Sequence, residues 1–232
     1  MPRLILSADL HAEPVKFQGI EDAARREHAD IICCAGDLVD HAMPRAGQTR
    51  YVRDFVRRSN FPWIACSGNH DFDFNAESPF PVVPNWMDDL GAVQDGQTRR
   101  IGDLAITTIP WPVVPDTTWR GLVDRLIEQG QALSATIPWL ILIHEPPNDS
   151  RLGAGYKSER AELTSEIISN AEPDYALFAH IHQTPEYASG DWISPIQGGI
   201  GFQAGQAERG VKPQYIVLDI KPGGWQADHS HF

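Results

Sequence analysis

The 232-residue sequence has few cysteines, few basic side chains and no long apolar run. Its three cysteines, Cys33, Cys34 and Cys66, are odd in number and include no Cys-x-x-Cys pair, which disfavours a disulfide framework and a structural zinc site. We interpret them as small buried side chains in a reducing compartment. No apolar run approaches the roughly 20 residues that span a bilayer, and the N-terminus lacks the apolar core and cleavage site of a signal peptide. We therefore expect a cytoplasmic protein with no membrane partner.

Acidic side chains outnumber basic ones by 31 to 19, so the formal net charge is −12. A broad duplex-binding surface usually contains a basic stripe, so this balance disfavours nucleic acid as a partner without excluding it. Basic residues cluster only at Arg25–Arg26, Arg45–Arg58 and Arg99–Arg100. Two of these clusters lie in expected helices, where a solvated face is the simpler interpretation. An apolar content of 42% supports a packed globular core and excludes intrinsic disorder.

Apolar periodicity predicts an α/β protein. We expect strands at Arg3–Ser7, Ile31–Ala35, Pro62–Ser67, Trp139–Ile143, Tyr175–Ala179, Asp191–Ile196 and Tyr215–Ile220, and helices at Phe17–His28, Gln48–Ser59, Thr118–Leu133 and Glu159–Ser169. The first 70 residues alternate strand and helix, which favours a parallel sheet with right-handed crossovers. Residues 92–110 are expected to form a hairpin, residues 72–90 a long loop that ends in a helical turn, and residues 198–210, with five glycines, an irregular segment. With no repeat or linker, residues 1–232 are expected to be one domain.

Polar side chains follow five of the expected strands at the point where each strand ends. These residues are Asp9 and His11; Asp37 and Asp40; Asn69, His70 and Asp71; His144; and His180 and His182. In open α/β sheets, ligands bind beyond the carboxyl ends of the strands. One histidine or one aspartate at such a point is an ordinary turn residue or helix cap. Five such points with compatible chemistry instead predict one site.

The donor types at this site indicate metal binding. Carboxylate and imidazole groups suit Mn, Fe, Zn, Ni or Mg more than a thiolate-seeking metal. Alternate residues of an extended segment share a face, so Asp9 and His11 can point together, as can His180 and His182. Seven of these residues are candidate donors: Asp9, His11, Asp37, Asn69, His144, His180 and His182. They exceed the needs of one metal once water is added, and they suit two metals about 3.5–4 Å apart with a bridging carboxylate.

The motifs resemble those of the calcineurin-like metallophosphoesterases. The matching blocks are Asp9-Leu10-His11, Gly36-Asp37-Leu38-Val39-Asp40, Gly68-Asn69-His70-Asp71, His144 and His180-Ile181-His182, in the order that this family has. The resemblance implies a four-layer α/β/β/α sandwich, two divalent metal ions and hydrolysis of phosphate esters. We expect no capping domain within residues 1–232. One departure is Ala179, because the last block of the family normally opens with glycine.

Carried over to this chain, the resemblance assigns a role to each residue. It implies that one metal is held by Asp9, His11 and His182, the other by Asn69, His144 and His180, with Asp37 bridging them. His70 would contact the phosphate and protonate the leaving oxygen, and Asp40 would orient His70. A hydroxide bridging the two metals would attack phosphorus in line, since divalent metals lower the pKa of bound water toward 7.

These inferences favour a phosphodiesterase of a small or nucleotide-like substrate, with Mn, Fe, Zn or Ni as metal. A weaker resemblance to SbcD-type nuclease subunits, carried by residues 36–41, 174–183, 198–205 and 215–220, makes a DNA exonuclease or endonuclease the alternative. A non-catalytic protein-interaction scaffold on the same fold is the alternative of another class. The intact His70 and ligand positions disfavour it.

Three further residues stand close to the motifs. His41 could reach the substrate, although a solvated loop histidine is the simpler interpretation. Glu145 could support His144, although we expect a carboxylate on the loop surface. Tyr156, in a Gly-Ala-Gly-Tyr stretch, could belong to a flexible lid.

Overall fold

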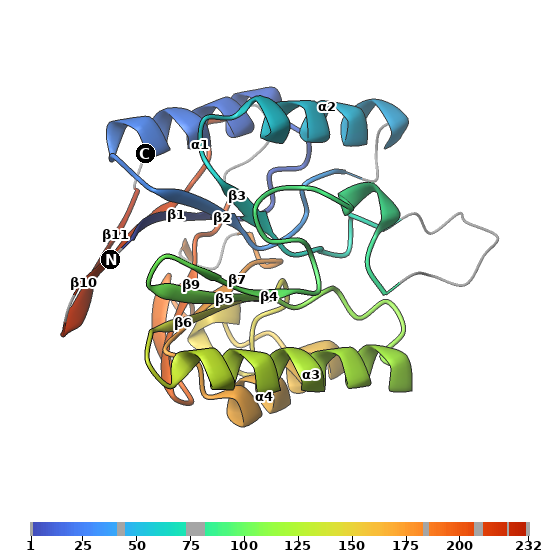
Figure 1. Ribbon diagram of the computed structural model, residues 1–232, viewed down its shortest axis with the longest axis vertical. Helices are drawn as coiled ribbons and strands as arrows, with labels where there is room; N and C mark the ends of the chain where they lie inside the picture. The colour runs from blue at the N-terminus through green and yellow to red at the C-terminus, as the bar shows by residue number, and fades with distance from the viewer. Residues whose placement is uncertain are drawn as a thin grey trace.

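Two β-sheets face each other, and two helices cover the outer face of each sheet (Figure 1). This computed structural model describes residues 2–40, 45–72, 82–182, 186–206, 211–221 and 223–230. The five-stranded sheet has the order β11-β10-β1-β2-β3 and consists of β1 (Arg3–Ser7), β2 (Ile31–Cys34), β3 (Trp63–Ala65), β10 (Ile216–Lys221) and β11 (Gly224–His229). The six-stranded sheet has the order β4-β5-β6-β7-β9-β8 and consists of β4 (Thr98–Ile101), β5 (Leu104–Thr108), β6 (Trp139–Leu142), β7 (Tyr175–Phe178), β8 (Ile193–Ile196) and β9 (Gly199–Gln203). The predicted four-layer α/β/β/α sandwich is confirmed.

The centre of each sheet is parallel. Strand β1 pairs in parallel with β2, which pairs in parallel with β3. In the other sheet β5, β6, β7 and β9 are parallel. The antiparallel strands β10, β11, β4 and β8 lie toward the edges. The carboxyl ends of the parallel strands therefore share one side within each sheet, as the strand and helix alternation predicts.

Alternation of side chains along the strands separates three apolar layers. Leu4 and Leu6 of β1 enter the layer between the two sheets, whereas Ile5 packs under the helices. Strand β6 follows the same rule, since Leu140 lies between the sheets and Ile141 faces the outer helices. Successive side chains of a strand point to opposite faces. Because both faces are covered, these strands are apolar throughout, which explains their continuous apolar runs.

The helices pack on the sheets through one apolar face each. Helices α1 (Pro14–Arg26) and α2 (Arg45–Arg58) cover the five-stranded sheet, and α3 (Thr117–Ser134) and α4 (Glu159–Ala171) cover the other, as Figure 1 shows. Helix α1 begins three residues before the predicted start because Pro14 occupies its first turn, where no backbone donor is needed. Two short 3-10 helices, η1 (Asn85–Met87) and η2 (Arg151–Gly153), lie in loops. No helix in the described ranges is both long and apolar enough to cross a membrane.

Two segments differ from the prediction. Part of residues 198–210 is strand β9, not an irregular segment, and its glycines allow close contact. A Cβ at Gly201 would lie 2.9 Å from Ile196 Cγ2, and a Cβ at Gly199 would overlap the backbone of Asp174. Strand β11 was not predicted, because an exposed edge strand has no apolar alternation. The expected hairpin at 92–110 corresponds to β4 and β5, and the expected helical turn corresponds to η1.

Candidate metal centre

The loops that follow the parallel strands hold several site residues in left-handed backbone conformations. The φ angle is 53° at Asp9, 49° at His11, 52° at Asp37 and 70° at His180. Such conformations are unfavourable for residues other than glycine and concentrate at functional sites. Backbone hydrogen bonds hold two of these loops together, since Asp9 N–H donates to Gly36 O (3.1 Å) and His11 N–H donates to Asp37 O (2.9 Å).

Two glycines let these loops approach each other. A Cβ at Gly36, where φ is +90°, would lie 2.7 Å from His144 Nδ1 and 2.7 Å from Gly68 N. A Cβ at Gly68 would lie 2.6 Å from Asp37 N and 2.8 Å from His144 Cε1. No side chain fits at either position without displacing its neighbours. The glycines of the two motif blocks are thus needed for packing at the site as well as for turns.

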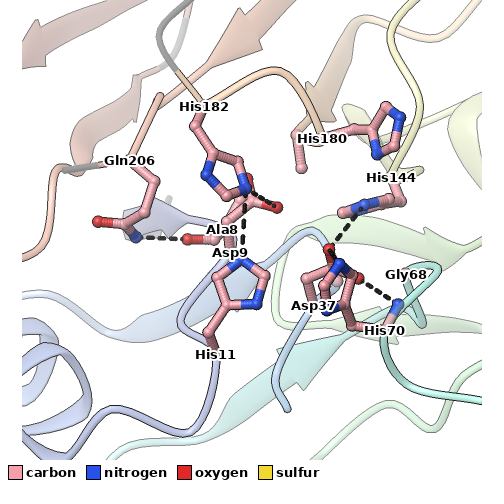
Figure 2. A network of polar contacts seen from close by, with 12 residues as sticks. Ala8, Asp9, His11, Asp37, Gly68, His70, His144, His180, His182 and Gln206 are labelled. Carbon is pink, nitrogen blue, oxygen red and sulfur yellow. Dashed lines mark hydrogen bonds and ion pairs between the residues drawn. The ribbon is translucent and has the colours of Figure 1, made fainter. Parts of the chain in front are cut away.

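Asp9, His11 and His182 form a first group of donors. Each offers one ligand atom, and the three atoms lie within 4.8 Å of one another. His182 Nε2 lies 3.5 Å from Asp9 Oδ1 and 3.3 Å from His11 Nε2. Figure 2 shows both rings turned toward the carboxylate. Gln206 connects the backbone of His182 to the loop that carries Asp9. Its backbone N–H donates to His182 O (2.8 Å), and its side chain donates to Ala8 O (2.6 Å).

Asn69, His144 and His180 form a second group. Asn69 Oδ1 lies 3.0 Å from His144 Nε2 and 3.0 Å from His180 Nδ1. The other nitrogen of His144, Nδ1, lies 2.7 Å from Ala35 O, so it donates there and leaves the lone pair on Nε2. Three atoms that can act as metal ligands therefore converge at this point.

The Asp37 carboxylate joins the two groups. Its Oδ2 lies 3.4 Å from His144 Nε2, and ligand atoms of Asp9, Asp37 and His144 lie within 4.8 Å of one another. Its Oδ1 accepts a hydrogen bond from His70 N–H (2.8 Å). Asp37 therefore lies between the first group and the second group.

His70 and Asp40 lie beside the two groups. His70 Nε2 lies 3.8 Å from Asp37 Oδ2, and His70 Nδ1 lies 3.5 Å from Asp40 Oδ1. Gln48 of α2 holds Asp40 in place, because it accepts from Asp40 N–H (2.6 Å) and donates to Asp40 O (3.1 Å). The His70 ring thus has one nitrogen toward a buried carboxylate and the other toward the donor groups. All nine predicted site residues lie at this pole, and their roles stay predictions.

Burial and charge set the protonation of the histidines. Burial lowers the pKa of His11 and of His180 to about 4, so both rings are neutral and can act as ligands at neutral pH. Burial alone would lower the pKa of His144, but the Asp37 carboxylate raises it above the usual range. The Asp9 carboxylate, 3.5 Å from the His182 ring, raises the pKa of His182. The Asp9 and Asp37 carboxylates thus favour positive charge close to them, as expected of a site that attracts cations.

Unpartnered polar atoms indicate that metals fit here. Both carboxylate oxygens of Asp9 and Nδ1 of His11 are buried and accept or donate no hydrogen bond among the described residues. Buried polar atoms nearly always have a partner, so each such atom requires an explanation. Oxygen and imidazole donors arranged around a shared carboxylate suit divalent ions such as Mn, Fe, Zn or Ni.

Asp71 was expected at this pole without a role, and Trp111 was not predicted there. The buried Asp71 carboxylate accepts hydrogen bonds from the backbone N–H groups of Leu38, Val39 and Gly68, and so ties the loops after β2 and β3 together. Trp111 follows β5, and its ring centroid lies 5.4 Å from that of His144. Trp111 could have been identified from the sequence as a site residue, because it lies just beyond the carboxyl end of a strand.

The sequence left more than one interpretation open for Glu145, Tyr156 and His41, and it departed from the family pattern at Ala179. Glu145 is 3% exposed, so the expectation of a loop-surface carboxylate is wrong. Tyr156 is partly exposed, and its ring centroid lies 5.9 Å from that of His180. Ala179 is buried in the layer between the sheets. The left-handed conformation falls on His180, so alanine replaces the usual glycine at 179 without backbone strain. His41 lies outside the described residues.

Comparisons with known proteins agree with this geometry. The sequence profile of the calcineurin-like phosphoesterase family matches residues 2–184. Comparison with curated protein sequences gives no match. Among solved structures, a dimetal phosphatase of Danio rerio has a TM-score of 0.67 at 9% identity, over 99% of this chain and 96% of its own. The TT1561 protein of Thermus thermophilus has a TM-score of 0.66 at 13% identity, over 98% of both chains. At such identities these structures are similar in fold alone.

Proposed function

The chain belongs to the calcineurin-like phosphoesterase family and is a metal-dependent phosphoester hydrolase, and from this premise we propose that it hydrolyses phosphodiesters at a dinuclear metal centre. The observation that carries the proposal is the convergence of two donor groups on the Asp37 carboxylate. Asp9, His11 and His182 would hold one metal, and Asn69, His144 and His180 the other, with Asp37 shared. When bound, two such ions supply Lewis-acid stabilisation of phosphoryl oxygens and a nucleophile derived from water at neutral pH.

His70 would act on the phosphate. Its Nε2 faces the donor groups and its Nδ1 faces Asp40, so the ring can contact a phosphate oxygen while Asp40 orients it. Burial lowers the pKa of His70, and the nearby Asp37 carboxylate opposes that effect. Protonated His70 would donate its Nε2 proton to the departing alkoxide, a step worth about 10²–10⁴-fold in rate.

Local charge would bring a phosphate ester to the site although the protein as a whole carries a net charge of −12. Charges beyond roughly 8 Å are largely screened at physiological salt, so the cations at the site decide the attraction. We propose a small or nucleotide-like diester as the substrate.

The test is a metal-reconstituted substrate screen. Protein stripped with a chelator is loaded with Mn, Fe, Zn or Ni and assayed with a bis-aryl phosphate and a mono-aryl phosphate, and then with cyclic nucleotides. We expect metal-dependent turnover that is higher for the diester. Higher turnover of the monoester would contradict the diesterase assignment, and turnover unaffected by the chelator would contradict the metal centre.

One observation favours a nuclease as the second candidate. Helix α2 holds five of the 19 basic residues and one acid, so the rest of the chain has 14 basic and 30 acidic residues and a net charge of −16. Arg50, Arg53 and Arg57 line the same hollow on α2. A nuclease would cut single-stranded DNA in Mn, and the triple alanine variant would lose this cutting while it keeps aryl-diester turnover. Intact DNA after incubation with wild type would exclude this candidate.

We further infer that residues 1–232 work as one catalytic domain of a cytoplasmic protein. Both sheets contribute donors to the same centre, and they share the apolar layer between them. Cys33, Cys34 and Cys66 are free and buried, as is usual in a reducing compartment. Limited proteolysis that released a stable half of the chain would contradict the single domain.

A further inference from the structure

A buried carboxylate stands behind the second donor group and has no part in the proposed chemistry. Glu145 directly follows His144 and is 3% exposed. Its Oε2 lies 3.8 Å from His180 Nε2, while its Oε1 accepts a hydrogen bond from the Ser158 hydroxyl (2.5 Å). The two oxygens therefore face two different partners.

On the basis of the proposed function, we propose that Glu145, held by Ser158, is a positioning residue that fixes the ring of His180 as a metal ligand through Nδ1. In this arrangement Nε2 carries the proton and faces Glu145, so the lone pair is on Nδ1. That nitrogen lies 3.0 Å from Asn69 Oδ1, on the side where the second donor group converges.

Asn69 and Glu145 face the two ring nitrogens of His180. Three aromatic rings surround it, with centroids 5.2 Å away for His144, 5.6 Å for Trp111 and 5.9 Å for Tyr156. Ring edges and faces can hold the plane of an imidazole, but they do not distinguish its two nitrogens. The Glu145 carboxylate favours a proton on Nε2, whereas Asn69 Oδ1 can accept one from Nδ1 unless that nitrogen is a metal ligand.

Ser158 gives the carboxylate a fixed place. It is the N-cap of α4, where its hydroxyl oxygen accepts a hydrogen bond from Ala161 N–H (2.9 Å) and its proton goes to Glu145. The first turn of a helix thereby anchors Glu145. Carboxylates that accept from a ligating histidine fix its tautomer and ring orientation, and their loss typically weakens metal binding by about 10–100-fold.

The test is calorimetric titration of chelator-stripped protein with Mn. We expect wild type to bind two Mn ions, and Glu145→Ala to keep one of them at wild-type affinity while the other weakens by about 10–100-fold. Glu145→Gln retains an acceptor of the same size, so it should stay within about threefold of wild type, which also controls for a folding defect. Glu162→Ala removes an exposed acid of α4 and should leave both sites unchanged.

A second readout does not depend on metal. Nitrogen-15 NMR of the metal-free protein, with the His180 signals assigned from a His180→Asn variant, should show a larger share of the Nε2–H tautomer in wild type than in Glu145→Ala, because Asn69 Oδ1 competes for a proton on Nδ1. Two sites of wild-type affinity and an unchanged tautomer in Glu145→Ala would overturn the positioning role. Wild type that binds fewer than two Mn ions would instead contradict the dinuclear centre itself.

Discussion

Substitution of Gly68 by alanine tests the packing that brings the two sheets' loops together. Gly68 does not have a positive φ, so the change adds a methyl group without backbone strain. The new Cβ would overlap Asp37 Oδ1 and lie 2.6 Å from Asp37 N and 2.8 Å from His144 Cε1, whereas ordinary contact begins at 3.4 Å. Asp37 must therefore move away by at least 0.8 Å and His144 by 0.6 Å if Gly68 stays in place.

These displacements should affect both stability and metal binding. Overpacking of a buried site costs about 1–3 kcal/mol, and each kcal/mol lowers Tm by about 2–4 °C in a chain of this length. We therefore expect a Tm that is lower by about 2–12 °C. Ligands of a metal site must be held within about 0.5 Å of their productive positions, so Mn affinity should fall by at least about tenfold.

Differential scanning calorimetry and Mn titration measure the two effects. Gly47→Ala is the matched control, because a Cβ at Gly47 of α2 meets nothing within 4 Å. Alanine favours helix over glycine by about 0.8–1 kcal/mol, so this control should be slightly more stable than wild type and bind Mn equally well. If Gly68→Ala kept wild-type Tm and Mn affinity, the close packing of Asp37 and His144 described above would be wrong.

Three other perturbations address separate parts of the site and core. Asp37→Ala should lose at least one metal, because both donor groups meet at this carboxylate, and metal analysis that found two ions at full occupancy would refute the bridge. His70→Ala should keep both metals and lose turnover by about 10²–10⁴-fold, whereas an empty metal position would contradict its assignment as a non-ligand. Burial raises the pKa of Asp95 to about 7, so the folded protein keeps a proton that the unfolded chain releases near pH 4. The resulting stabilisation is complete below about pH 4 and is lost as pH rises to about 7, by up to about 4 kcal/mol. Asp95→Asn should remove this decline. If denaturant unfolding showed the same loss of unfolding free energy between pH 5 and pH 8 in the variant and in wild type, the prediction would be contradicted.

Most of the fold followed from local patterns. The buried strands at 3–7, 31–35 and 139–143 were identifiable because both of their faces are covered, which makes them apolar throughout. Strands β9 and β11 were missed for opposite reasons. The glycines of β9 serve close contact with neighbouring elements and imitate a loop, and β11 is an exposed edge strand with too little apolar contact to leave a pattern.

The kinds of donor in the site and their order were determined by the sequence alone, because each donor follows a strand and the residue type sets the chemistry. Only the tertiary structure decided which donors meet. The pairing of His11 with His182 spans 171 residues, and that of His144 with Asn69 spans 75. Glu145 shows the same division: its sequence favoured a surface loop, and its burial between Ser158 and His180 depends on a helix N-terminus and a strand end that only folding brings together.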